Sequence, residues 1–496
     1  MRILRSIALP QEVAADILVV GVFEGSEITP VSRLDAALGG HLSEHVREEA
    51  FKAETGATIV IHTHGKLPYR KLALLGLGAR KGFDVSRLRS AAAGAVKMAE
   101  ASKAKALALW IPLERSGAKI GEALQAAAEG LLLGGYRYDA YKGEKKAKTL
   151  ETATVLVATN VNAKAFEKAV ADAEAFAGAS MYARHLVNTP ALDMHPATFV
   201  QEALALAVGQ KRMSIKIYGR KELQDMGCGG ILAVAQGSAH EPKMIHLAYK
   251  PPNARKRVVL VGKGVTFDSG GLSIKPADGM MDMKIDMAGA AAVLGVFRAL
   301  ATLKLQIEVH GVMAMVENMP SGTAIRPGDI VKTMSGKTIE ILNTDAEGRV
   351  TLADALFYGA ELKPDLMIDL ATLTGAAIIA LGHDIGALLS DDDRLAVRLE
   401  QAAAVSGESV WRLPLYAPYA EQVKGRHADF KNIGGKGGPG TITAGLFLKE
   451  FIGETASWAH LDIAGPAYNE KEYQDERSWG ASGYGARLLL EFLRKL

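Results

Sequence analysis

Residues 1–162 alternate short apolar runs with longer alanine-rich stretches. DILVVGVF, ATIVIHTHG and KLALLGLG are rich in aliphatic and β-branched residues and predict strands, and a helix is expected from Val85 to Ala104. LALWIPL and TATVLVATN predict two further strands, separated by a helix near Gly121 to Leu133. Strands that alternate with helices in this way are typical of an α/β domain.

The rest of the chain opens with one long helix, predicted from Ala163 to about His185, which ends where NTPALDMHP interrupts the helical pattern. Strands then alternate with helices again. The expected strands are SIKIYG, KMIHLAYK, RVVLVGKG, QIEVHGVMAMV, LMIDLATLTG and WAHLDIAG. The expected helices are Ala288 to Ala301, Thr351 to Leu362, Arg394 to Val405, Ala444 to Phe451 and Ala486 to Leu493.

This pattern predicts an α/β protein of two domains. A small N-terminal α/β domain is expected over residues 1–162, a connecting helix over 163–187 and a larger C-terminal α/β domain over 188–496. The larger domain should have a mostly parallel or mixed central sheet with helices on both faces. Ligands bind open sheets of this kind at the carboxyl ends of the strands, so candidate chemistry is sought there.

Composition narrows the partners and the compartment. The chain has 58 Lys and Arg against 55 Asp and Glu, a net charge of +3, which is too small to mark nucleic acid or an anionic membrane as the main partner. The single cysteine, Cys228, excludes an intramolecular disulfide and a thiolate metal cluster. The opening residues lack a signal-peptide core, and the longest weakly polar stretch, residues 371–382, is shorter than the ~20 residues that span a bilayer. We therefore expect a cytoplasmic protein without a membrane partner.

The segment 257–276, RVVLVGKGVTFDSGGLSIKP, joins a predicted strand to a glycine-rich loop with Lys263, Asp268 and Lys275. It does not match a dinucleotide fingerprint, because the third glycine is misplaced and no acid follows at the required distance. It also lacks the GxxxxGK[ST] pattern of a phosphate-binding loop. Taken alone, this segment is equally consistent with a turn that carries solvated charges.

Further acids follow in two other segments. Asp286 precedes an alanine-rich helix in MKIDMAGAAAV, a place where aspartate also serves as a helix cap. In IEILNTDAEGRV, Asp345, Glu347 and Arg349 occupy alternate positions, and an extended segment would project all three to one side.

Four carboxylates are thus expected near one edge of the sheet. Without cations they would repel one another, and two divalent cations would cancel their four charges. Oxygen ligands suit Mn²⁺, Mg²⁺ or Zn²⁺, and two such ions ~3.5–4 Å apart are a common arrangement for hydrolysis. A lysine can join such a site as a neutral ligand after losing its proton, and a charged lysine can stabilise an oxyanion.

A competing motif lies in the N-terminal domain. The residues from His41 to His45, HLSEH, match the HxxEH pattern of inverted zinc proteases. An amphipathic surface helix after two glycines explains the same letters. Nothing matches GxSxG, so serine-hydrolase chemistry has no support in the sequence.

NTDAEGR at 343–349 resembles the signature of the leucyl aminopeptidase (cytosol aminopeptidase) family of two-metal exopeptidases. VGKGVTFDSGG, SIKP, MKIDMAGAAAV, DLATLTGA and WAHLDIAG resemble its motifs in the same order, so the resemblance covers about residues 188–496. The N-terminal block resembles the family only in size and alternation. Val350 and Ala288 depart from the commonest residues of the motifs, and neither is a ligand.

The resemblance implies a set of metal ligands. The tightly held ion would be bound by Lys263, Asp268, Asp286 and Glu347. The exchangeable ion would be bound by Asp268, Asp345 and Glu347.

The resemblance also implies roles in catalysis and substrate binding. Lys275 would polarise the peptide carbonyl and stabilise the gem-diolate, and Arg349 would hold a bicarbonate that acts as general base. The residues expected to contact the substrate are Met283, Thr372, Leu373, Gly375 and Ala464.

The implied activity is the release of N-terminal amino acids, with a leucine-type preference, from peptides with a free N-terminus. A hydroxide bridging two Mn²⁺ or Zn²⁺ ions would attack the peptide bond. Members of the family form homohexamers, and some bacterial members also bind DNA. A homohexamer and a second, DNA-binding role are therefore expectations that rest on the resemblance alone.

Overall fold

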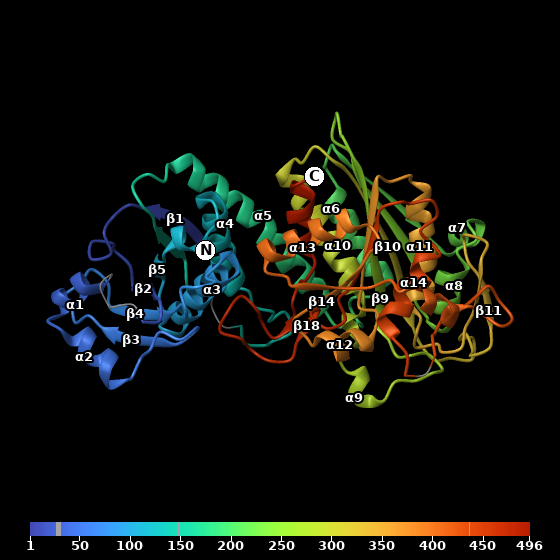
Figure 1. Cartoon of the computed structure of the whole chain (residues 1–496), viewed down its shortest axis with the longest axis horizontal. Helices are drawn as coiled ribbons and strands as arrows, with labels where there is room; N and C mark the ends of the chain where they lie inside the picture. The colour runs from blue at the N-terminus through green and yellow to red at the C-terminus, as the bar shows by residue number, and fades with distance from the viewer. Residues whose placement is uncertain (26–30, 146–148, 436) are drawn as a thin grey trace. The chain divides into compact units, whose positions relative to one another are not determined.

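The computed structural model describes residues 1–25, 31–145, 149–435 and 437–496, which fold into two compact units (Figure 1). Unit 1 comprises Met1–Ala177 and Lys471–Trp479, and unit 2 comprises Gly178–Glu470 and Gly480–Leu496. The long helix α5 (Ala163–Asn188) contributes to both units. The return of residues 471–479 to unit 1 was not anticipated from the sequence.

Unit 1 is a six-stranded sheet in the order β1-β6-β5-β2-β4-β3, in which only β3 runs antiparallel to its neighbour. One face carries the paired helices α3 and α4, which approach so closely at Gly130 that a Cβ there would lie 2.1 Å from the Arg89 carbonyl oxygen. The strands are β1 (Arg2–Ser6), β2 (Ile17–Val22), β3 (Thr58–His62), β4 (Lys71–Gly76), β5 (Ala106–Trp110) and β6 (Thr152–Leu156). The helices are α1 (Ser32–Leu38), α2 (His41–Glu48), α3 (Val85–Ala101) and α4 (Ile120–Gly134).

Unit 2 is built on an eight-stranded mixed sheet in the order β15-β14-β17-β13-β9-β10-β8-β7. Its centre is parallel, since β9 pairs in parallel with both β13 and β10, and antiparallel pairs lie toward the two edges. The strands are β7 (Met213–Tyr218), β8 (Lys243–Tyr249), β9 (Arg257–Asp268), β10 (Glu308–Asn318), β13 (Leu366–Ala371), β14 (Gly386–Leu389), β15 (Val410–Leu413) and β17 (Trp458–Asp462). Smaller sheets are formed by β11 (Ile330–Lys332), β12 (Thr338–Glu340) and β16 (Phe430–Lys431), and by β18 (Tyr468–Asn469) and β19 (Gly480–Ala481).

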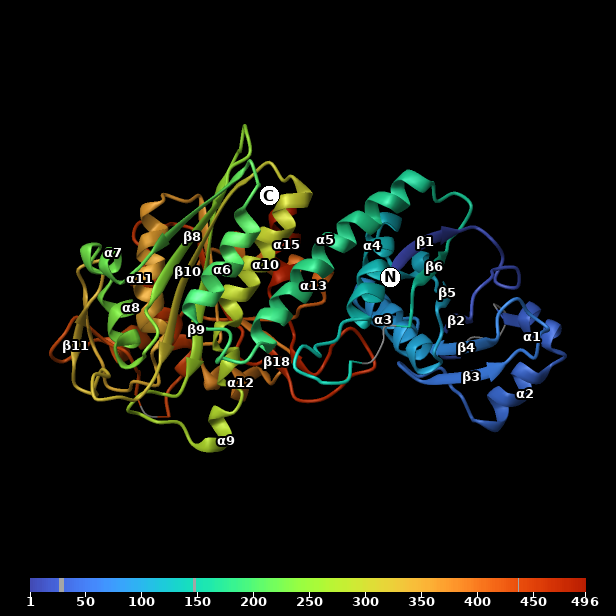
Figure 2. The ribbon, with the colours of Figure 1, turned by 180° about the vertical axis from the view of Figure 1, so that it is seen from behind.

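Helices cover both faces of this sheet (Figures 1 and 2). One face carries α6 (Pro196–Ala207), α10 (Ala288–Leu303), α13 (Asp393–Ser406) and α15 (Ala486–Arg494). The other carries α8 (Gly229–Val234), α11 (Gly348–Glu361) and α14 (Gly440–Lys449). The short helices α7 (Arg220–Asp225), α9 (Ala277–Met280) and α12 (Gly375–Leu381) lie at the ends of the layers. Residues 277–303 are long and apolar enough to cross a membrane, but 83% of the apolar stretch within them is buried in the fold, as in a core helix.

The predicted α/β class with two domains is confirmed, and the predicted strands and helices are present within a few residues of their expected bounds. The expectation that residues 339–350 form an extended segment was wrong. Only β12 is a strand there, and it belongs to the small three-stranded sheet and not to the central one. Asp345 lies in a turn and Glu347 caps a helix with φ −74° and ψ −35°, so the segment is not extended.

Candidate metal centre

Lys263 and Asp268 lie on β9, the strand at the middle of the central sheet. Gly262 and Gly264 flank Lys263, and a Cβ at Gly262 would lie 2.6 Å from the Cα of Ala290, so α10 packs directly on the strand backbone. Side chains alternate along a strand, and Lys263 therefore extends to the other face, where its side chain is 4% exposed. Asp268 ends the strand at the edge where open sheets bind ligands.

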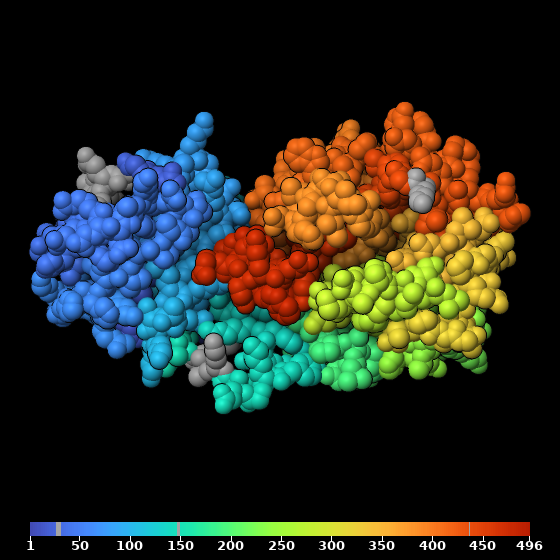
Figure 3. All heavy atoms as spheres, turned by 90° about the horizontal axis from the view of Figure 1, so that it is seen from below, coloured from blue at the N-terminus to red at the C-terminus, as the bar shows by residue number. Residues whose placement is uncertain are grey.

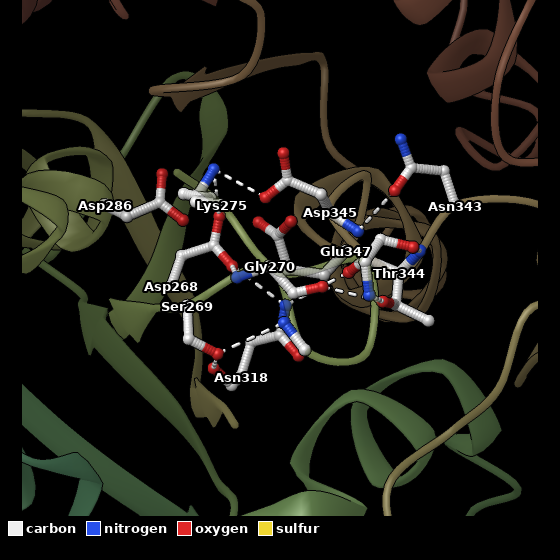
Figure 4. Close-up of polar contacts among 12 residues, drawn as sticks. Asp268, Ser269, Gly270, Lys275, Asp286, Asn318, Asn343, Thr344, Asp345 and Glu347 are labelled. Carbon is white, nitrogen blue, oxygen red and sulfur yellow. Dashed lines mark hydrogen bonds and ion pairs between the residues drawn. The ribbon is translucent and has the colours of Figure 1, made fainter. Parts of the chain in front are cut away.

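The loop after β9 is held by hydrogen bonds to Asp268. Its Oδ1 accepts from the backbone N–H of Gly270 at 2.9 Å and from Nδ2 of Asn318 at 2.8 Å, and its Oδ2 lies 2.9 Å from Nζ of Lys275. Gly270 has φ +85° and a Cβ there would lie 2.5 Å from the Ser273 carbonyl oxygen, so this turn requires glycine. The loop thereby brings Lys275 back over the strand end (Figure 4).

Asp286 lies in the 3-10 turn Met283–Met287 that leads into α10. Its Oδ1 lies 2.7 Å from Nζ of Lys263 and accepts from the Thr372 hydroxyl at 2.8 Å, which ties it to the ends of β9 and β13. Its Oδ2 is buried and has no hydrogen-bond partner within the described part of the chain. The Asp286 side chain therefore does not serve as a helix cap and keeps an oxygen available for another partner.

Asp345 and Glu347 come from the turn before α11. Oδ1 of Asp345 lies 2.6 Å from Nζ of Lys275, and Oε1 of Glu347 lies 2.9 Å from Nζ of Lys263. The turn is joined to the loop after β9 by Thr344, whose hydroxyl donates to the Gly270 carbonyl oxygen at 2.6 Å. Figure 4 shows the carboxylates of this turn pointing toward those of Asp268 and Asp286.

All five predicted ligands and Lys275 are thus brought together. Three carboxylate oxygens, one each from Asp268, Asp286 and Glu347, lie within 4.8 Å of one another, and all three residues are buried. Four carboxylates face two ammonium groups and the guanidinium of Arg349 beside Glu347, so the carboxylates outnumber the cationic groups in this buried site. An unpartnered oxygen on Asp286 and an excess of buried negative charge fit divalent cations with oxygen ligands.

Burial and neighbouring charges shift the ionisation of the site. Burial raises the pKa of Asp286, although Lys263 opposes the effect, and burial raises the pKa of Asp345 to about 6. Burial alone would lower the pKa of Lys263, but the carboxylates of Asp286 and Glu347 raise it above its usual value. As it stands, Lys263 is an ammonium, and it becomes a ligand only when a cation displaces its proton.

Arg349 is the second residue of α11 and is buried beside Glu347. Burial lowers its pKa to about 10, with Glu347 and Asp462 acting in the opposite direction, so the guanidinium remains a cation at neutral pH. Its Nε is buried without a hydrogen-bond partner among the residues described. A planar cation with an unused donor fits a small planar anion.

The predicted substrate-contacting residues lie on loops around the centre. Met283 opens the 3-10 turn that carries Asp286, and Gly375 opens α12 at an exposed position. The Thr372 carbonyl oxygen accepts from Nζ of Lys263 at 2.9 Å. In Figure 3 the yellow-green segment that holds α9 lies at the surface beside the orange segment of the later chain, and α9 and α12 are neighbours in Figures 1 and 2.

The backbone N–H groups of Leu373 and Ala464 both donate to Asp462, a residue that the sequence analysis did not identify. Oδ1 of Asp462, at the end of β17, accepts from the N–H groups of Leu373 at 3.1 Å and Ala464 at 3.2 Å. Its Oδ2 accepts from the hydroxyl of Thr374 at 2.6 Å. Asn318 was also missed, and its position at the end of the strand next to β9 was the signal that would have indicated it.

The competing HxxEH segment forms α2, the expected surface helix, in which only Leu42 is buried. His41 and His45 belong to unit 1, whereas every member of the carboxylate cluster belongs to unit 2.

Both parts of the chain match profiles of the same protein family. The profile described as "Cytosol aminopeptidase family, catalytic domain" matches residues 181–490, and the profile of that family's N-terminal domain matches residues 19–145. The chain is 44% identical to a probable cytosol aminopeptidase of Geobacter sp. (strain M21) over 100% of both chains. It is 42% identical to a protein of the same description from Aquifex aeolicus (strain VF5), over 96% of this chain and 95% of that one.

Two solved structures have similar folds. The bottromycin maturation enzyme BotP in complex with Mn superposes with a TM-score of 0.86 and 38% identity, over 97% of this chain and 99% of that one. A mutant of tomato leucine aminopeptidase superposes with a TM-score of 0.91 and 34% identity, over 100% of this chain and 97% of that one.

Proposed function

The chain belongs to the cytosol aminopeptidase family and is a metal-dependent aminopeptidase, and on this premise we propose that its buried carboxylate cluster is the catalytic centre and holds two divalent cations. The observation that carries the proposal is that one carboxylate oxygen each of Asp268, Asp286 and Glu347 lie within 4.8 Å of one another in a buried site. Mn²⁺ or Zn²⁺ suits these ligands, and Mn is present in the similar BotP structure. The proposed catalytic domain is residues 188–496.

The proposed ligands would be divided between two cations. Lys263, Asp268, Asp286 and Glu347 would hold one cation, and Asp268, Asp345 and Glu347 the other. Asp268 and Glu347 would therefore be shared. When bound, the two cations would lower the pKa of a water molecule and offset negative charge on the carbonyl oxygen of the peptide.

Lys275 is the proposed electrophile. Its ammonium lies 2.9 Å from Oδ2 of Asp268 and 2.6 Å from Oδ1 of Asp345, and these carboxylates keep its pKa above the usual value against the effect of burial. A charged donor at the edge of the cluster would stabilise the oxyanion that develops when the peptide carbonyl is attacked.

Arg349 is proposed to hold bicarbonate. Its buried guanidinium has an unused Nε donor, and it lies two residues after Glu347, whose charge acts on it. A planar anion would match the guanidinium fork, and bicarbonate bound there would supply a general base that no histidine of the cluster provides.

The substrate is proposed to be a peptide with a free N-terminus and an apolar first residue. Met283, Thr372, Leu373, Gly375 and Ala464 would line the position of that residue, which supports a leucine-type preference. A cytosolic location and a homohexamer complete the proposal. They rest on the names of the relatives and on the family resemblance respectively, and the net charge of +3 offers no support for an added DNA-binding role.

The test is hydrolysis of leucine p-nitroanilide by chelator-stripped protein, with Mn²⁺, Zn²⁺ or Mg²⁺ added back. Wild-type activity should disappear on stripping and return with Mn²⁺ or Zn²⁺. The Asp345→Ala variant should stay at least ~100-fold less active under every condition, because it lacks a ligand of the second cation.

The control is His41→Ala, which should hydrolyse the substrate at the wild-type rate. The HxxEH alternative predicts the reverse, with loss in His41→Ala and full activity in Asp345→Ala. Activity that survives stripping, or survives in Asp345→Ala, would mean that the cluster is not the catalytic centre.

A further inference from the structure

A hollow of about 670 Å³ in unit 1 is lined by four histidines and two glutamates. The histidines are His41 and His45 on α2 and His62 and His64 at the end of β3, which lies beside α2 in Figures 1 and 2. The chain has 12 histidines, so a third of them line this one hollow. The proposed catalytic centre uses none of them.

The helix contributes its ligand-bearing side chains from one face. His41, Glu44, His45 and Glu48 are spaced three and four residues apart, and such positions are neighbours on a helix surface. A histidine pair separated by four residues on one helix face is a zinc-binding spacing. Nδ1 of His41 lies 3.4 Å from Oε2 of Glu44, a carboxylate of the kind that orients metal-bound imidazoles.

The strand presents its histidines to the same hollow. Alternation along β3 turns Ile59 toward the core and His62 outward. Thr63 is fully buried and its hydroxyl donates to the Tyr69 carbonyl oxygen, so His64 faces outward again. The rings of His62 and His64 are 6.0 Å apart, and His64 adopts φ +48°, a left-handed conformation that is uncommon outside glycine and is found often at functional sites.

We propose that this hollow is a second metal site, which binds a divalent transition-metal cation through the imidazoles of His41, His45, His62 and His64. The side chain of His41 is 69% exposed, so its ring is free to change rotamer within the hollow. Lys66 also lines the hollow, but its Nζ donates to the Leu38 carbonyl oxygen at 3.2 Å, which holds its charge at the end of α1.

The ligand chemistry separates this site from the catalytic one. Imidazole ligands favour Ni²⁺, Zn²⁺ and Cu²⁺, whereas the carboxylates of the catalytic cluster also suit Mn²⁺ and Mg²⁺. A simpler explanation is that polar side chains keep the edge strand β3 from pairing with another chain, which requires no metal at all. The two explanations differ in whether an ion binds.

The experiment is equilibrium dialysis of the full-length protein against Ni²⁺, with bound nickel counted per chain. Wild type is compared with His41→Ala/His45→Ala and His62→Ala/His64→Ala. The matched control is His383→Ala/His427→Ala, which removes two exposed imidazoles of unit 2 that do not line the hollow. Nickel at the catalytic cluster is common to all four proteins and cancels in the comparison.

We expect the helix-pair variant to bind one Ni²⁺ fewer than wild type, the strand-pair variant to bind that ion at least ~10-fold more weakly, and the control to match wild type. Hydrolysis of leucine p-nitroanilide should be unchanged in all variants, which verifies folding. Equal nickel counts in all four proteins would overturn the proposal, and so would a loss confined to the helix pair. The nickel count does not depend on hydrolysis, so this result is independent of the proposed function.

Discussion

At the scale of single residues, the centre is defined by which charged groups face each other. Lys263 and Lys275 each lie between two carboxylates, but their surroundings differ: the side chain of Lys263 is 4% exposed and that of Lys275 is 16% exposed. The deeper lysine is enclosed by the carboxylates and suits a ligand. The shallower one lies where a substrate can reach it and suits an electrophile.

Lys275→Ala should lower kcat for leucine p-nitroanilide by at least ~100-fold, because a charged donor to the developing oxyanion is lost. Both cations should remain bound, since the five proposed ligands are intact. Steady-state kinetics together with metal analysis after dialysis checks both statements. Unchanged turnover would refute the electrophile role, and loss of metal would make Lys275 part of the metal site instead.

Asp462 positions two loops at once, since it accepts from Leu373, Thr374 and Ala464. Asp462→Asn keeps the shape and an oxygen for the two backbone N–H groups, but it removes the negative charge and places N–H₂ against the Thr374 hydroxyl. Hydrogen bonds to a charged acceptor contribute about 1.5–3 kcal/mol each, so the loops are held less firmly. We expect KM for leucine p-nitroanilide to rise ~10-fold or more, with a smaller change in kcat and full metal occupancy. An equal fall in kcat with loss of metal would show that Asp462 supports the ligands and not the substrate loops.

At the scale of elements, the position of Asp286 depends on how closely α10 approaches the sheet. A Cβ at Gly289 would lie 2.1 Å from the Leu370 carbonyl oxygen and 3.0 Å from the backbone nitrogen of Lys263. The helix start therefore rests directly on β9 and β13, three residues after Asp286. The alanine-rich sequence of α10 serves this contact, since small side chains let a helix lie close to a strand.

Gly289→Ala should destabilise the protein by about 3 kcal/mol, because the added methyl group forces backbone apart in a packed core. Activity should fall with it, since Asp286 moves away from Lys263. The matched control is Gly178→Ala in α5, where a Cβ meets no atom within 4 Å and the change should stabilise the helix by up to ~1 kcal/mol. Thermal unfolding of both variants is the measurement, and a Gly289→Ala protein as stable as wild type would contradict the close approach.

At the scale of the whole molecule, unit 2 contains a second polar network, whose hydrogen bonds include none of the residues of the carboxylate cluster. Nδ1 of His246 lies 2.8 Å from the hydroxyl of Tyr358, its Nε2 lies 2.8 Å from Nδ1 of His310, and Nε2 of His310 lies 2.8 Å from Oε1 of Glu308. The chain of contacts crosses β8, β10 and α11. Burial, and then the neighbouring His310, lower the pKa of His246 to about 4.

This shift predicts a pH dependence of stability. The unfolded chain takes up a proton at His246 near pH 6.5, whereas the folded protein does so only near pH 4. Between these values the unfolded state binds more protons, so the free energy of unfolding decreases as pH falls, by about 3 kcal/mol over the window. Below pH 4 both states are protonated and this group causes no further loss.

The measurement is the Tm of wild type and His246→Gln between pH 7 and pH 4.5. The variant lacks this protonation difference, so its Tm should fall less steeply than that of wild type. Parallel curves would show that His246 is protonated equally in both states.

Local patterns along the chain were enough to predict the α/β class, most helices and strands, and the residue types of the centre. These depend on local periodicity and on short motifs such as NTDAEGR, in which the chemistry is carried by a few neighbouring letters. Tertiary structure decided how the motifs meet. Asp345 meets Lys275 from a turn and not from an extended strand. Asp462 holds the loop that carries Leu373, although the two residues are 89 positions apart in the sequence. The order β17-β13-β9-β10 brings these ends together, and strand order arises from packing between distant segments, which local preference does not encode.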